Sequence, residues 1–200
     1  FTGNMFGFTS GYFGAQWLVI PKAPLLAGNP ATVTSIPDSN SGTIQPCRTM
    51  DPLLDKIYAV SLESNSSLKV YAVQNPGTAP TVSQTILAVP AFVTNTGLAQ
   101  SVAGQIDTLP DRVFGSCIRN GKIVTGHSVN VSNSDNRTMC RWYEIKVNSW
   151  PASGAPTLSQ SGNVTAANGN YIVPALYSNK FGDISLLATA CSPTVAADIV

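Results

Sequence analysis

The sequence predicts an all-β protein, built as a β-propeller-like array of four-stranded antiparallel blades. Three observations lead to this prediction. Short runs of β-branched and aromatic residues alternate with Asn, Gly, Ser and Pro, which is typical of strands and turns. No long stretch places apolar residues at helical spacing. The phrase Ala-Pro-Thr, then Val or Leu, then Ser-Gln occurs twice, from Ala79 and from Ala155.

The repeated phrase marks the last strand of a longer unit. The strand before it reads LKVYAVQ (68–74) in one copy and CRWYEIKV (140–147) in the other, and both alternate in strand fashion. The strand before that reads KIYAVSL (56–62) or KIVTGHSV (122–129). The Asn-Gly pair at 120–121 predicts a type I′ hairpin, because both central positions of that turn need positive φ.

Two more diverged copies lie near the ends of the chain. Residues 5–12, 15–22 and 29–35 stand for three of the strands, which puts Trp17 in line with Val70 and Trp142. Residues 171–191 parallel 112–129 as a strand, a turn and a second strand. The approximate units are therefore 1–37, 38–90, 106–165 and 170–200. Repeated four-stranded antiparallel units are typical of propeller blades; a β-sandwich and a β-helix are the alternatives.

The unit count also bears on completeness. Two units are complete and two are partial, whereas closed propellers have at least about four blades. Because an open arc would expose strand edges, we expect these residues to be a fragment of a larger propeller.

Composition limits the classes of partner. Charged residues make up 10% of the chain, against about 25% in typical domains. The 11 basic and 10 acidic residues are scattered, so we expect no nucleic-acid partner and no anionic membrane surface. No apolar run approaches the roughly 18 residues that span a bilayer. Low charge with abundant Ser, Thr and Asn is typical of exported bacterial proteins, so we expect an extracellular or cell-surface location.

The four cysteines leave two interpretations open. Cys47, Cys117, Cys140 and Cys191 are compatible with two disulfides, in any of three connectivities. They are equally compatible with four buried, small apolar side chains.

Several stretches resemble a family of secreted bacterial β-propeller proteins of unassigned function. They are residues 106–129, with an Asp-Arg pair before the Asn-Gly hairpin, then CRWYEI (140–145) and residues 171–188. Residues 66–73, 89–92 and 16–28 are similar to that family's preceding blade, so the resemblance covers nearly the whole chain. It implies a propeller fold and an extracellular setting, and it attaches no activity.

No catalytic constellation is recognisable in the sequence. His127 is the only histidine, and a catalytic triad would have to combine it with Ser116 or Ser128. No Gly-x-Ser-x-Gly elbow is present, which favours a structural histidine. With one histidine and dispersed cysteines, we expect no zinc site and no cofactor.

Carboxylates and arginines support a second hypothesis, an exported glycoside hydrolase or lyase. Asp107, Asp111 and Asp183 lie at strand ends or turns, where a propeller glycosidase would hold acidic groups. Arg48 and Arg112 would face a channel, although a structural pair between Arg112 and Asp111 is the simpler interpretation. Residues 178–185 keep only the Ser and Gly of the sialidase repeat Ser-x-Asp-x-Gly-x-Thr-Trp. The turn that contains Asp135 suggests either calcium binding or, more simply, a solvated turn.

The leading hypothesis is an extracellular module that binds a protein or a glycan through one loop face. Trp150 has no partner in the repeat and is the candidate exposed contact residue, with covering of a core edge as the alternative. Asp107 and Arg112 complete the candidate ligand-binding set. A purely structural role at the cell surface is the third hypothesis.

Overall fold

The computed structural model describes residues 1–9, 11–49, 51–110 and 112–200. It confirms the all-β prediction, with 60% of residues in strands and 3% in helix. Among the described residues, the helix α1 (Lys22–Leu26) is short, with 5 residues. No helix among the described residues has the length and apolar character to cross a membrane.

Most strands belong to four antiparallel sheets, which we number in chain order. The first sheet contains β1 (Thr2–Gly7), β2 (Gly11–Val19) and β3 (Thr34–Asp38). The second contains β4 (Gln45–Pro46), β6 (Ile57–Ser64), β7 (Ser67–Gln74) and β8 (Thr81–Ala88). The third contains β11 (Val113–Arg119), β12 (Lys122–Ser132), β13 (Asp135–Lys146) and β14 (Thr157–Val164), with β5 (Arg48–Thr49) added in parallel beside β11. The fourth contains β15 (Asn170–Ser178), β16 (Ile184–Ser192) and β17 (Val195–Ile199).

The strands of the two clear copies lie where the sequence predicts them. The phrase that occurs twice forms β8 and β14, and each of these strands begins directly after the proline of the phrase. The Asn-Gly hairpin is also confirmed, because Asn120 and Gly121 have φ values of 50° and 69°.

The first copy is less regular than the sequence suggests. Residues 5–7 belong to β1 and residues 11–12 to β2, so residues 5–12 are not one strand. Residues 29–33 are irregular, so that β3 begins only at Thr34. Trp17 nevertheless lies in β2, which has a neighbouring strand on both sides. Val70 in β7 and Trp142 in β13 also lie on inner strands of their sheets.

Two local features recur between sheets and support their equivalence. Strands β11 and β15 both contain a β-bulge, after Phe114 and after Ile172, with φ near 50° at the next residue in each case. The turns after β6, β12 and β16 share a second feature. In each turn a serine hydroxyl, that of Ser64, Ser132 or Ser192, accepts a hydrogen bond from the backbone N–H of the residue two positions later.

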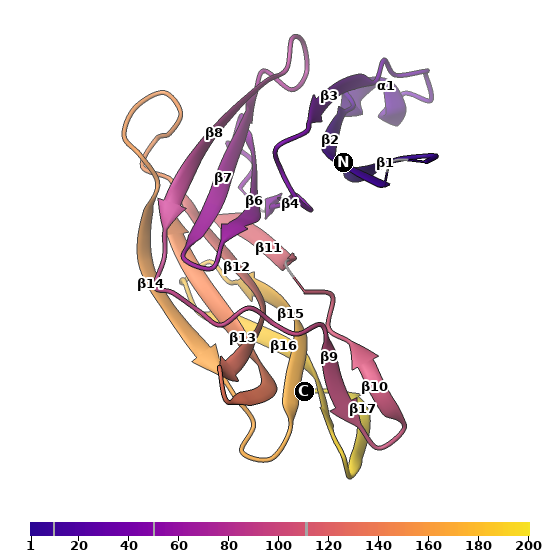
Figure 1. The fold of residues 1–200 in the computed structure, drawn as a ribbon. Coiled ribbons are helices and arrows are strands. Elements are labelled where there is room, and N and C mark those ends of the chain that lie inside the picture. Colours follow the sequence, from indigo (N-terminus) through magenta and orange to yellow (C-terminus); the bar gives the residue numbers. More distant parts are fainter. Residues whose placement is uncertain (10, 50, 111) are drawn as a thin grey trace.

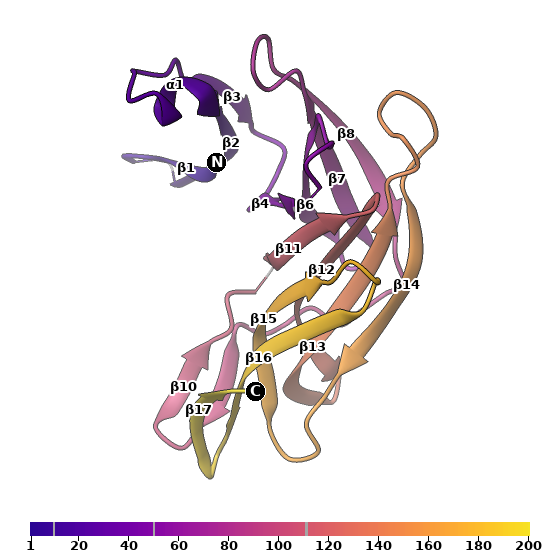
Figure 2. The same ribbon diagram turned by 180° about the vertical axis from the view of Figure 1, so that it is seen from behind.

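The sheets stack face to face in the order in which they occur in the chain (Figures 1 and 2). Ala15, Trp17 and Val19 of the first sheet pack against Tyr71 and Val73 of the second. The largest apolar cluster lies between the second and third sheets, and Leu176 of the fourth sheet packs on Cys117 and Val124 of the third. The described residues form no closed barrel or closed propeller.

A separate hairpin, β9 (Leu98–Ser101) with β10 (Gly104–Asp107), lies beside the fourth sheet (Figure 1). Its two faces differ in polarity. Ala99 and Ile106, which are directly paired, pack with Ile172 and Cys191 of the fourth sheet. The opposite face is therefore left for other contacts.

The cysteines and the repeated aromatic residues are core components. All four cysteines are buried and unpaired, in agreement with the apolar interpretation. Trp17 and Tyr71 make an edge-to-face contact with ring centroids 5.5 Å apart, at the interface between the first two sheets.

Replacing Trp17 tests the importance of sheet stacking. Trp17→Ala should lower the free energy of unfolding by about 3 to 5 kcal/mol, because the side chain is only 2% exposed and leaves a cavity. Trp17→Phe should cost clearly less, since the indole Nε1 has no hydrogen-bond partner among the described residues. Urea unfolding followed by circular dichroism measures both; equal losses for the two variants would contradict the packing argument.

Candidate functional site

The expectation that Trp150 is an exposed contact residue is wrong. Its side chain is 9% exposed and belongs to the cluster between the second and third sheets. The carbonyl oxygen of Trp150 accepts a hydrogen bond of 2.6 Å from the hydroxyl of Tyr58, across the same interface. The loop after β13 folds back over the core, so the indole covers the edge of that core.

Asp107 and Arg112 lie away from Trp150, in other elements. Asp107 is exposed at the end of β10, and its Oδ1 accepts a hydrogen bond of 2.7 Å from the backbone N–H of Leu109. Arg112 is half-buried just before β11. Asp111 lies outside the described residues, and so does its proposed pairing with Arg112. The structure thus does not gather the three predicted residues into one site.

His127 is a structural residue in the described structure. It is 1% exposed, and its Nε2 lies 2.9 Å from the hydroxyl of Tyr143. Phe92 meets its ring edge to face, and the guanidinium of Arg141 lies over the Phe92 and Tyr143 rings. Burial, together with the nearby charge of Arg141, lowers the pKa of His127 to about 3.

The remaining chemical candidates also have structural roles. The hydroxyl of Ser116 is hydrogen-bonded to that of Thr125, and Ser128 accepts from the backbone N–H of Val173. Asp183 closes its own turn with Asn179. Within residues 1–9, 11–49, 51–110 and 112–200, no group of three or more His, Cys, Asp or Glu side chains could hold a metal ion.

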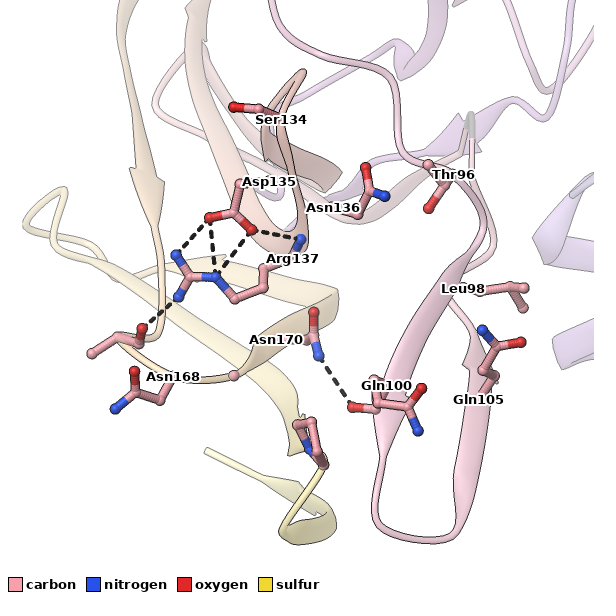
Figure 3. A pocket seen from close by; sticks show the side chains of 13 residues that line it. Thr96, Leu98, Gln100, Gln105, Ser134, Asp135, Asn136, Arg137, Asn168 and Asn170 are labelled. Atoms are coloured by element: carbon pink, nitrogen blue, oxygen red, sulfur yellow. Dashed lines mark hydrogen bonds and ion pairs between the residues drawn. The ribbon is translucent and has the colours of Figure 1, made fainter.

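An open groove of about 780 Å³ lies between the β9–β10 hairpin and one end of the third and fourth sheets (Figure 3). Its volume falls within the range of about 300 to 1,000 Å³ that is common for small-ligand sites. The groove is lined by Thr96, Leu98, Gln100, Gln105, Ser134, Asp135, Asn136, Arg137, Ala167, Asn168, Gly169, Asn170 and Pro193. Five of these thirteen residues carry carboxamides, and Asp135 and Arg137 are the charged residues among them, so the lining is mostly uncharged.

One wall of the groove is fixed by Arg137. Its guanidinium forms a two-pronged ion pair with Asp135, with Nη2 and Oδ2 2.6 Å apart. Its Nη1 donates to the carbonyl oxygens of Ala166 and Ala167, in the loop before β15. Hydrogen bonding to Arg137 lowers the pKa of the Asp135 carboxyl. Asp135 is therefore used in building this wall, where its partly exposed carboxylate is paired with Arg137.

The floor is fixed by Asn170, which is 4% exposed. Its Oδ1 accepts from the backbone N–H of Thr138, and its Nδ2 donates to the carbonyl oxygens of Gln100 and Cys191. A single buried carboxamide thus connects β13, β9 and β16. The preceding residue is Gly169, where a Cβ would approach the Cys191 carbonyl oxygen to 2.9 Å, so the close approach requires glycine.

The base of the hairpin is held by a second buried asparagine. Asn95 accepts hydrogen bonds from the hydroxyl of Thr108 and from the backbone N–H of Gly97, and it donates to the hydroxyl of Thr138. Because buried polar groups that satisfy one another make rigid local structure, the groove is formed before any ligand arrives.

The polar face of the hairpin points into the groove. Leu98, Gln100 and Gln105 line it, and they alternate with the buried Ala99 and the partly buried Ile106. Asp107 is paired directly with Leu98, so it shares that face and lies at the rim of the groove. Of the predicted ligand-binding residues, only Asp107 can be connected with the groove in this way.

A smaller hollow adjoins the same end of the sheets. It is lined by Asn65 and Asn133, in the turns after β6 and β12, and by residues 91–94. The turn after β12 contributes to both hollows, through Asn133 to one and Ser134 to the other. Both hollows therefore lie at the end of the sheets where these turns are found.

Sequence reasoning missed the residues that build the groove. Asn95, Asn170 and Arg137 are single polar residues without a recognisable motif. The sequence pointed to this region only indirectly, because Ser-Asn-Ser occurs at 64–66 and again at 132–134. The second of these turns borders both hollows.

The pKa of His127 leads to a prediction about stability. Between pH 6.5 and about 3 the unfolded chain binds a proton at this residue and the folded chain does not. The free energy of unfolding should therefore fall as the pH decreases through this window, by up to about 1.4 kcal/mol per pH unit from this group. Urea titrations of the wild type and of His127→Phe should show a weaker pH dependence in the variant; parallel curves would contradict the prediction.

Comparison of the chain with protein-family models, with curated proteins and with solved structures found no match. A function must therefore be argued from the geometry of the groove and from the packing of the sheets.

Proposed function

We propose that this chain is an extracellular binding module, built as an arc of β-propeller-like blades, which binds its ligand in the groove at the loop end of the sheets. The stacking of successive sheets, the shared bulge and the shared serine turns support the propeller-like arrangement. The low charge and the abundance of Ser, Thr and Asn support an extracellular location.

The observation that carries the binding proposal is the preformed groove. Its lining comes from four parts of the chain, and buried asparagines and an ion pair hold the walls in place. A binding site gains affinity when its groups are already in position, because less conformational entropy is lost on binding.

A glycoside hydrolase is less well supported than a binding module. Hydrolysis of this type needs two carboxyl groups on either side of the scissile bond. Asp135 is the carboxylate that lines the groove, and it is paired with Arg137, while Asp107 lies at the rim with one oxygen bound to backbone. Hydrogen bonding to Arg137 lowers the pKa of Asp135, whereas a general acid needs a raised pKa.

A bulky substitution in the groove tests the location of the site. Asn136 is exposed on the groove wall, so Asn136→Trp should obstruct the groove without disturbing the core. The matched control is Asn163→Trp, at an exposed position on β14 outside the groove. Binding of the whole chain to glycan and peptide arrays should fall at least about tenfold in the first variant and stay unchanged in the control.

Two results would count against the proposal. Equal binding by both tryptophan variants would place the site elsewhere. Absence of binding by the folded wild-type chain on both arrays would favour the purely structural role.

A further inference from the structure

The polar side chains of the groove fall into two groups. Asp135, Arg137 and Asn170 are used in building the walls. In contrast, the side chains of Gln105, Asn136 and Asn168 make no hydrogen bond to other described residues, and all three are exposed. They stand on β10, on β13 and on the loop before β15, so they approach the groove from three sides (Figure 3).

The charge of the groove excludes strongly ionic ligands. Asp135 and Arg137 are its charged lining residues, and their charges cancel across a distance of 2.6 Å. A phosphate, sulfate or carboxylate ligand would lose hydration on entry without meeting an unpaired cation. The groove therefore favours an uncharged ligand.

The three available carboxamides suit hydroxyl groups. Each carboxamide offers an acceptor oxygen and two N–H donors, and each hydroxyl both donates and accepts. A ligand with many neighbouring hydroxyls can thus satisfy all three side chains.

A protein partner fits the groove less well. Protein interfaces are centred on aromatic or aliphatic anchors that fill apolar pockets. The lining within the described residues has no aromatic side chain, and its larger apolar groups are Leu98 and Pro193. The surface lacks the apolar centre that such an interface needs.

We infer that the groove binds a neutral, hydroxyl-rich oligosaccharide, with Gln105, Asn136 and Asn168 hydrogen-bonding to its hydroxyl groups. This inference rests on the proposed function, because it takes the groove to be the binding site. The oligosaccharide would lie between the hairpin and the end of the third sheet, with Asp107 at the rim as a further acceptor.

The experiment uses the whole chain and uncharged oligosaccharides of glucose, mannose, galactose and xylose. Sialylated and uronic-acid oligosaccharides and polar peptides are screened in parallel. Titration calorimetry with the best neutral sugar then compares the wild type with Gln105→Ala and Asn168→Ala. Their matched controls are Gln160→Ala and Asn163→Ala, at exposed positions on β14.

Each groove variant should weaken binding of the neutral sugar about three- to tenfold, as expected for the loss of one ligand hydrogen bond. The controls should stay within about twofold of the wild type, and added salt should have little effect, since no ionic contact is involved.

The results separate the ligand class from the site. Binding of acidic sugars or peptides alone, with the same loss in the groove variants, would overturn the sugar assignment and leave the binding site intact. Neutral-sugar binding that neither the alanine variants nor Asn136→Trp reduce would overturn both proposals. Failure of the folded chain to bind any neutral sugar would overturn the inference.

Discussion

The structure depends on the burial of each sheet's apolar face against the next sheet along the chain. The middle strands show this most clearly. On β13, Tyr143 and Ile145 face the second sheet, while the neighbouring Trp142 packs toward the fourth. Because β13 is covered on both sides, it buries polar side chains as well, and the 4% exposed Glu144 forms an ion pair with Lys122.

Several charged and polar residues inside this stack are paired with one another. The ammonium of Lys69 lies 2.7 Å from Glu63, and it donates to the carbonyl oxygen of Asn40. Such pairs offset the cost of removing charges from water, although they do not in themselves add much stability. Inside the third sheet, His127 is hydrogen-bonded to Tyr143, and the guanidinium of Arg141 lies over the Tyr143 ring. Burial and the charge of Arg141 lower the pKa of His127, which keeps the histidine neutral.

Stacking also determines where a ligand can bind. When sheets pack in sequence, the turns that join equivalent strands emerge at the same end, and the hollows between them border on neighbouring sheets. Asn170 and Arg137 convert this uneven end into a groove of defined shape. The groove is therefore a consequence of the packing together with these polar contacts.

The sequence by itself determined the strands of the two clear copies and the Asn-Gly hairpin, because these depend on residues close together in the chain. The alternation of side chains and the positive φ required at Asn120 are local properties. Only the tertiary structure decided burial and the site. Val124 and Leu187 hold equivalent places opposite a bulged strand, yet they are 1% and 51% exposed, because a sheet covers only the first.

The same reason explains the errors and omissions in the site prediction. Trp150 was expected at the surface, but the core it covers comes from a sheet whose strands are distant in the sequence; its contact with Tyr58 joins residues 92 positions apart. Asn170 shapes the groove through Gln100, 70 residues earlier. Which residues meet across such separations depends on how the sheets stack, and no local pattern in the sequence records it.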